Sequence, residues 1–107
     1  MKHVLFVCGR NRLRSPTAEA VFSTYPGIEA ASAGTNPDAD TPVDAETVAW
    51  ADIIFVMEKR HREKLSSRFR SELKNVRVVC LDIPDTFAFM DANLVRILKA
   101  KVTPHLE

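Results

Sequence analysis

Cysteine is scarce in this chain: only Cys8 and Cys80 are present, far apart among 107 residues. Such spacing builds neither a disulfide framework nor a set of thiolate ligands for zinc. The three histidines, His3, His61 and His105, are equally scattered, and we interpret them as surface or packing residues. We therefore expect no metal and no cofactor, and we expect a reducing compartment, the cytoplasm, as the location.

Long apolar runs and an excess of one charge are also absent. No run approaches the roughly 20 apolar residues of a membrane span, and residues 1–8 are too short for a signal sequence. Lys and Arg number 15 against 14 Asp and Glu, so the net charge is only +1. No global field attracts nucleic acid or an anionic membrane, and we expect neither as a partner. Any anion site must be local.

The hydrophobic pattern alternates strands with helices over what we expect to be a single domain, residues 1–107. Strands are predicted at 4–7, 28–33, 53–57 and 76–81, and helices at 15–25, 41–51, 58–73 and after Asp91, which caps the last one. Ser15 and Thr41 are predicted to cap the first two helices, each followed by a proline at the first helical position. The fold class is therefore α/β, a four-stranded parallel sheet with right-handed crossovers and helices on both faces.

Ligands of such sheets bind beyond the carboxyl ends of the strands. The loops after the first, second and fourth strands, residues 8–14, 34–40 and 82–90, are thus the candidate site. The first begins with Cys8, carries Arg14 six residues later and runs directly into a helix. Backbone N–H groups of a curled loop and a helix N-terminus hold a phosphate dianion and favour a thiolate. The planar fork of Arg14 suits two phosphoryl oxygens at once.

At these residues the sequence resembles the low-molecular-weight protein tyrosine phosphatase family. The resemblance extends over residues 7–19, 32–35, 51–57 and 82–87, and the first of these segments, with its cysteine loop and Arg-Ser-Pro-Thr-Ala-Glu run, is the specific one. It implies a phosphatase whose loop after the first strand binds phosphate, and substrates that are phosphorylated proteins or small aryl phosphates. The phosphate-binding residues would be Gly9, Arg10, Asn11, Arg12, Leu13 and Ser15.

The resemblance also implies individual roles. Cys8 would be the nucleophile and Arg14 the oxyanion clamp, with Ser15 as a hydrogen-bond donor to the thiolate. Asn11, together with Ser32, would brace the loop.

Asp85 would be the general acid and Phe87 would flank the substrate ring. Asp82 is the competing acid, since both carboxylates follow the fourth strand. We prefer Asp85 because it follows Pro84 in a loop that is free to project over the cysteine, whereas Asp82 sits at the strand end.

Four departures from the family pattern are visible. Arg10 stands where glycine is usual, Leu13 replaces a second cysteine, and Thr86 stands where proline follows the acid. The segment between Gly34 and Asp52 is short, which predicts a more open cleft. Arg10 and Arg12 add positive charge beside the loop, so we also consider a preference for substrates with acidic flanks.

Two other functions stay open at this stage. Arsenate reductases of the same fold need further thiols, and Cys80, in an apolar strand where a small buried residue is expected, is the only candidate. A catalytically silent phosphate-binding or phosphoprotein-binding module would fit if Asp85 were not aimed at the loop. For the phosphatase, we expect hydrolysis in two steps through a cysteinyl-phosphate.

Overall fold

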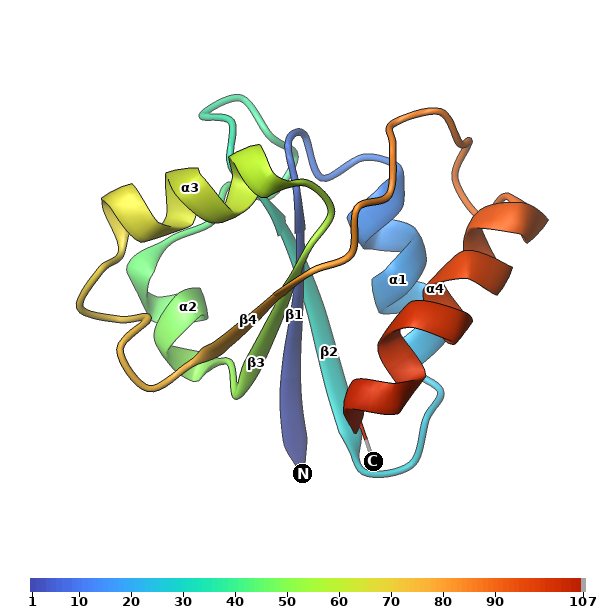
Figure 1. Ribbon diagram of the computed structural model, residues 1–107, viewed down its shortest axis with the longest axis horizontal. Helices are drawn as coiled ribbons and strands as arrows, with labels where there is room; N and C mark the ends of the chain where they lie inside the picture. The colour runs from blue at the N-terminus through green and yellow to red at the C-terminus, as the bar shows by residue number, and fades with distance from the viewer. Residues whose placement is uncertain (107) are drawn as a thin grey trace.

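The computed structural model describes residues 1–106 and alternates strands with helices along the chain (Figure 1). The elements are β1 (Lys2–Cys8), α1 (Arg14–Phe22), β2 (Ile28–Gly34), α2 (Ala45–Trp50), β3 (Ile53–Val56), α3 (Lys59–Arg68), β4 (Arg77–Cys80) and α4 (Ala92–Leu106). Each matches a predicted element, and the predicted α/β class is confirmed. None of the helices in the described part of the chain has the length and apolar character needed to cross a membrane.

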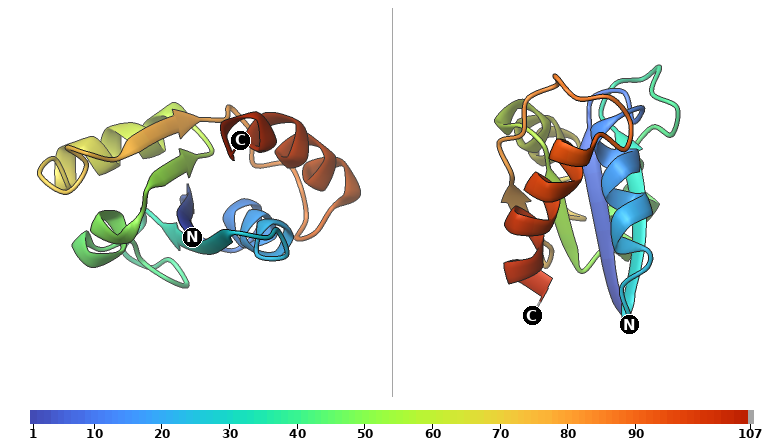
Figure 2. Two further views of the ribbon diagram at one scale, coloured as in Figure 1. Left: turned by 90° about the horizontal axis from the view of Figure 1, so that it is seen from below. Right: turned by 90° about the vertical axis from the view of Figure 1, so that its right-hand side faces the viewer.

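All strand pairs are parallel, in the order β2-β1-β3-β4. The predicted parallel sheet is therefore confirmed. The two central strands, β1 and β3, read as nearly continuous apolar runs because helices cover both of their faces. In register, Cys8 lies opposite Gly34 and Val56 lies opposite Cys80, so the strands end together. The segments after β1, β2 and β4 accordingly gather at one end of the molecule (Figure 2).

Alternate residues of the central strands supply two separate cores. Val4 and Phe6 of β1 pack beneath α1 and α4, whereas Leu5 and Val7 pack beneath α2 and α3. The two helix pairs therefore lie on opposite faces of the sheet, as Figure 1 shows. This arrangement follows from the side-chain alternation of a strand, which sends successive residues to opposite faces.

The predicted helix caps are wrong at both of the first two helices. The cap position of α1 is Leu13, whose apolar side chain makes no capping bond. Ser15 lies inside the helix, and its hydroxyl contacts the Cys8 sulfur. Pro16 is consequently the third helical residue, where its missing N–H still costs no intrahelical bond. Asp44, and not Thr41, caps α2 by accepting from the Thr47 N–H at 2.8 Å.

Two further boundaries differ from the predictions. Helix α1 ends at Phe22 and not at residue 25, and α3 ends at Arg68 and not at residue 73. On α2, Val48 is buried and Ala49 is exposed. Asp91 does cap α4, since its carboxylate accepts from the Asn93 N–H at 2.8 Å. The ends of short helices are hard to predict from the hydrophobic pattern alone, because tertiary contacts decide where these helices end.

The segment after β2 braces the loop after β1. Backbone N–H groups of Thr35 and Asn36 donate to the carbonyls of Cys8 and Gly9, each at 2.9 Å. Gly34 permits this close approach, because a Cβ atom there would lie 2.5 Å from Ala39 Cβ and 2.6 Å from the Gly9 carbonyl oxygen. The shape of the loop after β1 therefore depends on a glycine in another strand.

We expect Gly34→Ala to destabilise the protein by about 1–3 kcal/mol, because the added methyl group must displace backbone atoms of the braced loop. Gly9→Ala is the matched control. A Cβ at Gly9 would meet nothing closer than 3.7 Å, so this variant should unfold at nearly the wild-type urea midpoint. Equal urea midpoints for the two variants would contradict the proposed close packing at Gly34.

Candidate active site

The tight turn of the loop after β1 is made at Asn11, whose φ of 57° lies in the left-handed region. Asparagine tolerates this region better than most side chains do. Arg10 is not among the residues with positive φ in the described part of the chain. The arginine that replaces the usual glycine is therefore accommodated without this backbone strain, because the loop makes its turn one residue later.

The thiol of Cys8 lies at the carboxyl end of β1 and is almost fully buried. Its Sγ atom accepts from the Asn11 backbone N–H at 3.2 Å and lies 2.9 Å from the Ser15 hydroxyl oxygen. The Asn11 side-chain amide donates to that same hydroxyl oxygen at 3.0 Å. The hydroxyl hydrogen is thereby directed to the sulfur, and both contacts supply donors to a thiolate. Ser32, predicted as a second brace, instead donates to the Glu19 carboxylate.

Arg14 is the first residue of α1, and its guanidinium is buried, with only 3% of the side chain exposed. Its Nη1 donates to Glu58 Oε2 at 2.6 Å and to the Ile83 carbonyl at 2.7 Å. Its Nε lies 3.6 Å from Asp85 Oδ1. Groups of the loop after β3 and of the loop after β4 thus compensate the charge of Arg14. Through these contacts Arg14 joins both loops to the start of α1.

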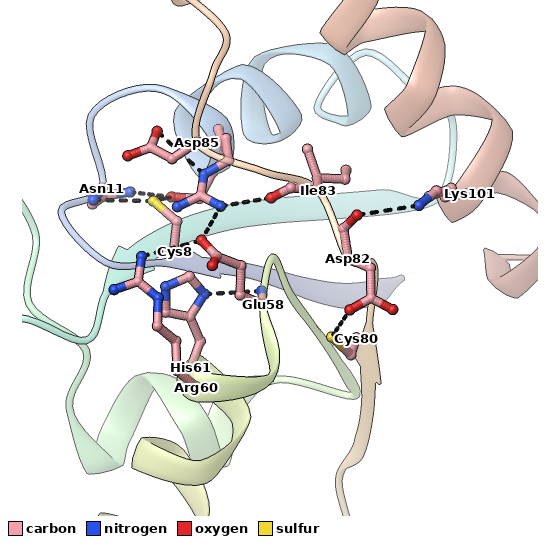
Figure 3. Close-up of polar contacts among 12 residues, drawn as sticks. Cys8, Asn11, Glu58, Arg60, His61, Cys80, Asp82, Ile83, Asp85 and Lys101 are labelled. Carbon is pink, nitrogen blue, oxygen red and sulfur yellow. Dashed lines mark hydrogen bonds and ion pairs between the residues drawn. The ribbon is translucent and has the colours of Figure 1, made fainter.

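The sequence interpretation missed Glu58, because the loop after β3 was not among the candidate loops. Its carboxylate is shared between Arg14 and Arg60, whose Nη2 lies 3.2 Å away (Figure 3). Partial burial raises the pKa of Glu58, but hydrogen bonds and positive charge from Arg60 and Arg14 outweigh it and lower the pKa to about 2. Glu58 is therefore ionised throughout the neutral range. The available signal was its position directly after a buried strand, which places it at the same sheet edge as Cys8.

His61 is a buried residue of this site and not a surface residue. Its Nδ1 accepts from the Glu58 backbone N–H at 3.1 Å and forms a reciprocal capping box at the start of α3. Burial, together with the charges of Arg14 and Arg60, lowers the pKa of His61 to about 4. The ring is thus neutral near pH 7 and carries its hydrogen on Nε2, which lies 3.7 Å from the place a Gly9 Cβ would occupy. His61 therefore packs against the loop that holds the thiol.

These elements surround a cavity of about 490 Å³ at the carboxyl end of the sheet. Its lining contains most of the predicted site residues together with two that were not predicted, Asn36 and Arg60: Cys8, Gly9, Arg10, Arg12, Leu13, Arg14, Asn36, Arg60 and Asp85. Asn11 and Ser15 lie behind the thiol and contact it from within the protein. The short segment after β2 contributes one lining residue, Asn36.

Phe87 does not line this cavity. It is half-buried and packs against the core cluster beneath α1 and α4. No aromatic side chain is among the lining residues in the described part of the chain. The role of Phe87 beside a substrate ring stays a prediction.

The two candidate acids lie in different places. Asp85 lines the cavity with Cys8 and Arg14, whereas Asp82 points away from the thiol and accepts from the Cys80 sulfur at 3.4 Å (Figure 3). Asp82 has a φ of 54°. Its neighbours Leu81 and Ile83 donate their backbone N–H groups to carbonyls at the end of β3, so the Asp82 side chain is turned away from the sheet. The geometry accordingly favours Asp85 over Asp82 for any chemistry at Cys8.

Cys80 is half-buried and not fully buried as its apolar strand predicted, because β4 is an edge strand. Burial raises the pKa of its thiol, and the adjacent Asp82 adds a like-sign charge to the thiolate form. Within residues 1–106, no group of three or more His, Cys, Asp or Glu side chains is arranged to hold a metal ion.

Comparison with known proteins agrees with this geometry. Residues 3–51, which contain the cysteine loop, match the model of the low molecular weight phosphotyrosine protein phosphatase family. No curated protein sequence matches the chain.

Solved structures of similar fold cover nearly the whole chain. Wzb of Vibrio vulnificus in complex with benzylphosphonate is 20% identical, with a TM-score of 0.79 over 97% of this chain and 96% of that chain. The low molecular weight protein tyrosine phosphatase of T. tengcongensis is 21% identical, with a TM-score of 0.76 over 99% and 98%. The YwlE arginine phosphatase of Geobacillus stearothermophilus is 22% identical, with a TM-score of 0.71 over 94% and 84%.

The predicted resemblance to the low molecular weight phosphotyrosine protein phosphatase family is therefore confirmed, by sequence over residues 3–51 and by fold over nearly the whole chain.

Proposed function

We propose that this chain hydrolyses phosphomonoesters, as a protein-tyrosine phosphatase or a phosphatase of small aryl phosphates, through a cysteinyl-phosphate on Cys8. The observation that carries the proposal is the convergence of three groups on one cavity. A thiol with two hydrogen-bond donors, a buried arginine and a carboxylate on a separate loop all face the same 490 Å³ space. A nucleophile, an oxyanion clamp and an acid are the groups that phosphoryl transfer through cysteine requires.

The first step forms the sulfur–phosphorus bond. The Cys8 thiolate attacks phosphorus in line, the ester oxygen–phosphorus bond breaks, and protonated Asp85 gives its proton to the departing oxygen. In the second step water attacks phosphorus, Asp85 takes up the proton of that water, and the thiolate leaves with release of inorganic phosphate. The cycle needs Cys8 as a free thiolate, which suits a reducing compartment such as the cytoplasm.

Arg14 presents one particular edge to the phosphoryl group. Its Nη1 is committed to Glu58 and to the Ile83 carbonyl, so the edge formed by Nε and Nη2 is left for two phosphoryl oxygens. This edge is turned toward Asp85, whose Oδ1 lies 3.6 Å from Nε. Glu58 therefore acts as a positioning residue that sets the orientation of the clamp before substrate arrives.

Two observations weigh against the alternative functions. Arsenate reduction needs a second thiol that reaches Cys8, but Cys80 does not line the cavity and its thiol is hydrogen-bonded to Asp82. A silent phosphate-binding module would not need a carboxylate beside the thiol, yet Asp85 lines the cavity. Single-turnover phosphate release from p-nitrophenyl phosphate, run in parallel with arsenate reduction under glutathione or thioredoxin, separates the three functions.

Cys8→Ser should lower the turnover of p-nitrophenyl phosphate at least 100-fold, because a serine hydroxyl at this position has no thiolate to offer. A 100-fold loss corresponds to about 2.7 kcal/mol of barrier at 1.36 kcal/mol per tenfold. The variant should still bind inorganic phosphate, since Arg14 and the loop N–H groups remain. Activity above about 1% of wild type would refute Cys8 as the nucleophile.

Asp85→Asn should slow phosphotyrosine and alkyl-substituted phenyl phosphates by roughly 10²–10⁴-fold, but slow nitrophenyl phosphates much less, because a general acid matters most for poor leaving groups. The matched control is Asp82→Asn. It removes a carboxylate that is three residues away in the sequence and is directed away from the cavity. A plot of log kcat/KM against leaving-group pKa reports the result. A steepened slope in Asp82→Asn alone would reverse the assignment.

Glu58→Ala should weaken phosphate binding and lower kcat/KM by roughly 10–100-fold, because Arg14 loses the partner that orients its fork. Glu58→Gln keeps an oxygen acceptor for Nη1 and should retain most of both. Because Glu58 also caps α3, Asp44→Ala serves as the control: it removes the cap of α2, away from the cavity. Asp44→Ala should lower stability and leave kcat/KM unchanged. Equal losses in Glu58→Gln and Glu58→Ala would show that orientation of Arg14 by this oxygen is not the cause.

A further inference from the structure

We propose that the mouth of the cavity selects phosphorylated segments with acidic flanks and rejects phosphoarginine, and that Arg10, Arg12 and Arg60 are the residues that discriminate. This inference rests on the proposed phosphatase function and narrows its substrate class. It concerns the part of the substrate that surrounds the phosphoryl group and not the group itself.

The cavity lining is strongly unbalanced in charge. Of its nine residues four are arginines and one, Asp85, is a carboxylate. Arg14 is buried and committed to the phosphoryl group, so Arg10, Arg12 and Arg60 remain for whatever lies beside it. They come from the loop after β1 and from the first turn of α3, so the positive charge is supplied by two separate elements. A chain whose net charge is only +1 thus concentrates positive charge at this opening.

Arg10 and Arg12 are only weakly neutralised by the protein. Arg12 lies 3.3 Å from Asp40, but both side chains are more than half exposed, with 53% and 57% accessible. Arg10 is exposed, and in the described part of the chain no carboxylate lies within ion-pair distance of it. Exposed ion pairs contribute little and are readily exchanged. Substrate carboxylates therefore compete for these arginines at low cost.

Arg60 differs from the other two because it shares Glu58 with the buried clamp. The Glu58 carboxylate lies 2.6 Å from Nη1 of Arg14 and 3.2 Å from Nη2 of Arg60. Arg14 is buried, whereas 58% of the Arg60 side chain is exposed, and Figure 3 shows its guanidinium directed toward Cys8. Glu58 keeps its contact with the buried Arg14 when the exposed Arg60 turns to an anion of the substrate.

Phosphoarginine does not suit the positive charge of this opening. Its leaving group is a guanidinium, which needs a carboxylate beside the phosphoryl group. Among the described residues the lining holds one carboxylate, Asp85, against four arginines, so a substrate guanidinium would meet mainly positive charge there. The arginine phosphatase whose fold resembles this chain is therefore a guide to the fold and not to the substrate. Because the described lining residues include no aromatic ring, charge is the main means of discrimination at the site.

The test compares four phosphopeptides of equal length. Three carry phosphotyrosine flanked by Glu, Gln or Lys, and the fourth carries phosphoarginine flanked by Gln. We expect kcat/KM to fall from Glu to Gln to Lys flanks by at least tenfold overall, and the span to shrink as salt is raised, because these contacts are exposed. We expect the phosphoarginine peptide to be at least tenfold slower than the Gln-flanked phosphotyrosine peptide.

Variants identify the responsible arginines through the ratio of kcat/KM for the Glu-flanked peptide to kcat/KM for the Lys-flanked peptide. Any general loss of activity cancels in this ratio. In the double variant Arg10→Ala/Arg60→Ala the ratio of kcat/KM for Glu-flanked to Lys-flanked peptide should fall at least fivefold. The control Arg96→Ala removes an arginine of α4 that bonds Asn93 and does not line the cavity, and its ratio should equal wild type. Equal kcat/KM for the three flanks, an unchanged ratio in the double variant, or faster turnover of phosphoarginine would overturn the proposal.

Measurements of peptide binding distinguish a failure of this inference from a failure of the proposed function. Dissociation constants of the four peptides on the Cys8→Ser protein should follow the same ranking without any turnover. If wild type hydrolyses none of the peptides and no p-nitrophenyl phosphate, the phosphatase function fails while the binding order still reports on the arginines. If turnover is normal but neither kcat/KM nor the dissociation constant depends on the flanks, only the specificity inference fails.

Discussion

A buried guanidinium holds together the functional end of this protein. Arg14 begins α1, yet its nitrogens reach Glu58 after β3 and both Ile83 and Asp85 after β4. A charge removed from water is tolerated only where partners surround it, so these loops have to close around the side chain. Because the same side chain is the proposed phosphate clamp, closing the fold at this end would also prepare the oxyanion site.

The neighbouring thiol depends on a second, uncharged network. Asn11 turns the loop, donates its backbone N–H to the Cys8 sulfur and directs the Ser15 hydroxyl toward it through the side-chain amide. Segment 34–40 then fixes the outside of the loop through backbone bonds. Every polar contact at the thiol is a donor, so the network suits a negative sulfur and later a negative phosphoryl group.

Burial divides the site into two parts. The floor, made of Cys8, Asn11, Arg14 and Ser15, is buried and its side chains have fixed partners. The mouth carries exposed arginines, and segment 35–51 contributes one described lining residue to it, Asn36. The proposed chemistry thus falls to buried groups and the proposed selection to exposed ones, which suits preorganisation for reaction and adaptability for recognition.

The α/β class, the four parallel strands and the place of the cysteine loop could be predicted from the sequence, because buried strands and helix stripes are local patterns with strong periods. The sequence also places Cys8, Arg14 and Ser15 at one strand-to-helix junction. The tertiary structure was needed to show that Glu58 and Arg60 share this site, that His61 is buried against it, and that Phe87 packs on the core. These outcomes depend on which loops meet at the edge of the sheet and on which charges compensate Arg14. No local pattern encodes such pairings, since they arise between residues more than 40 positions apart.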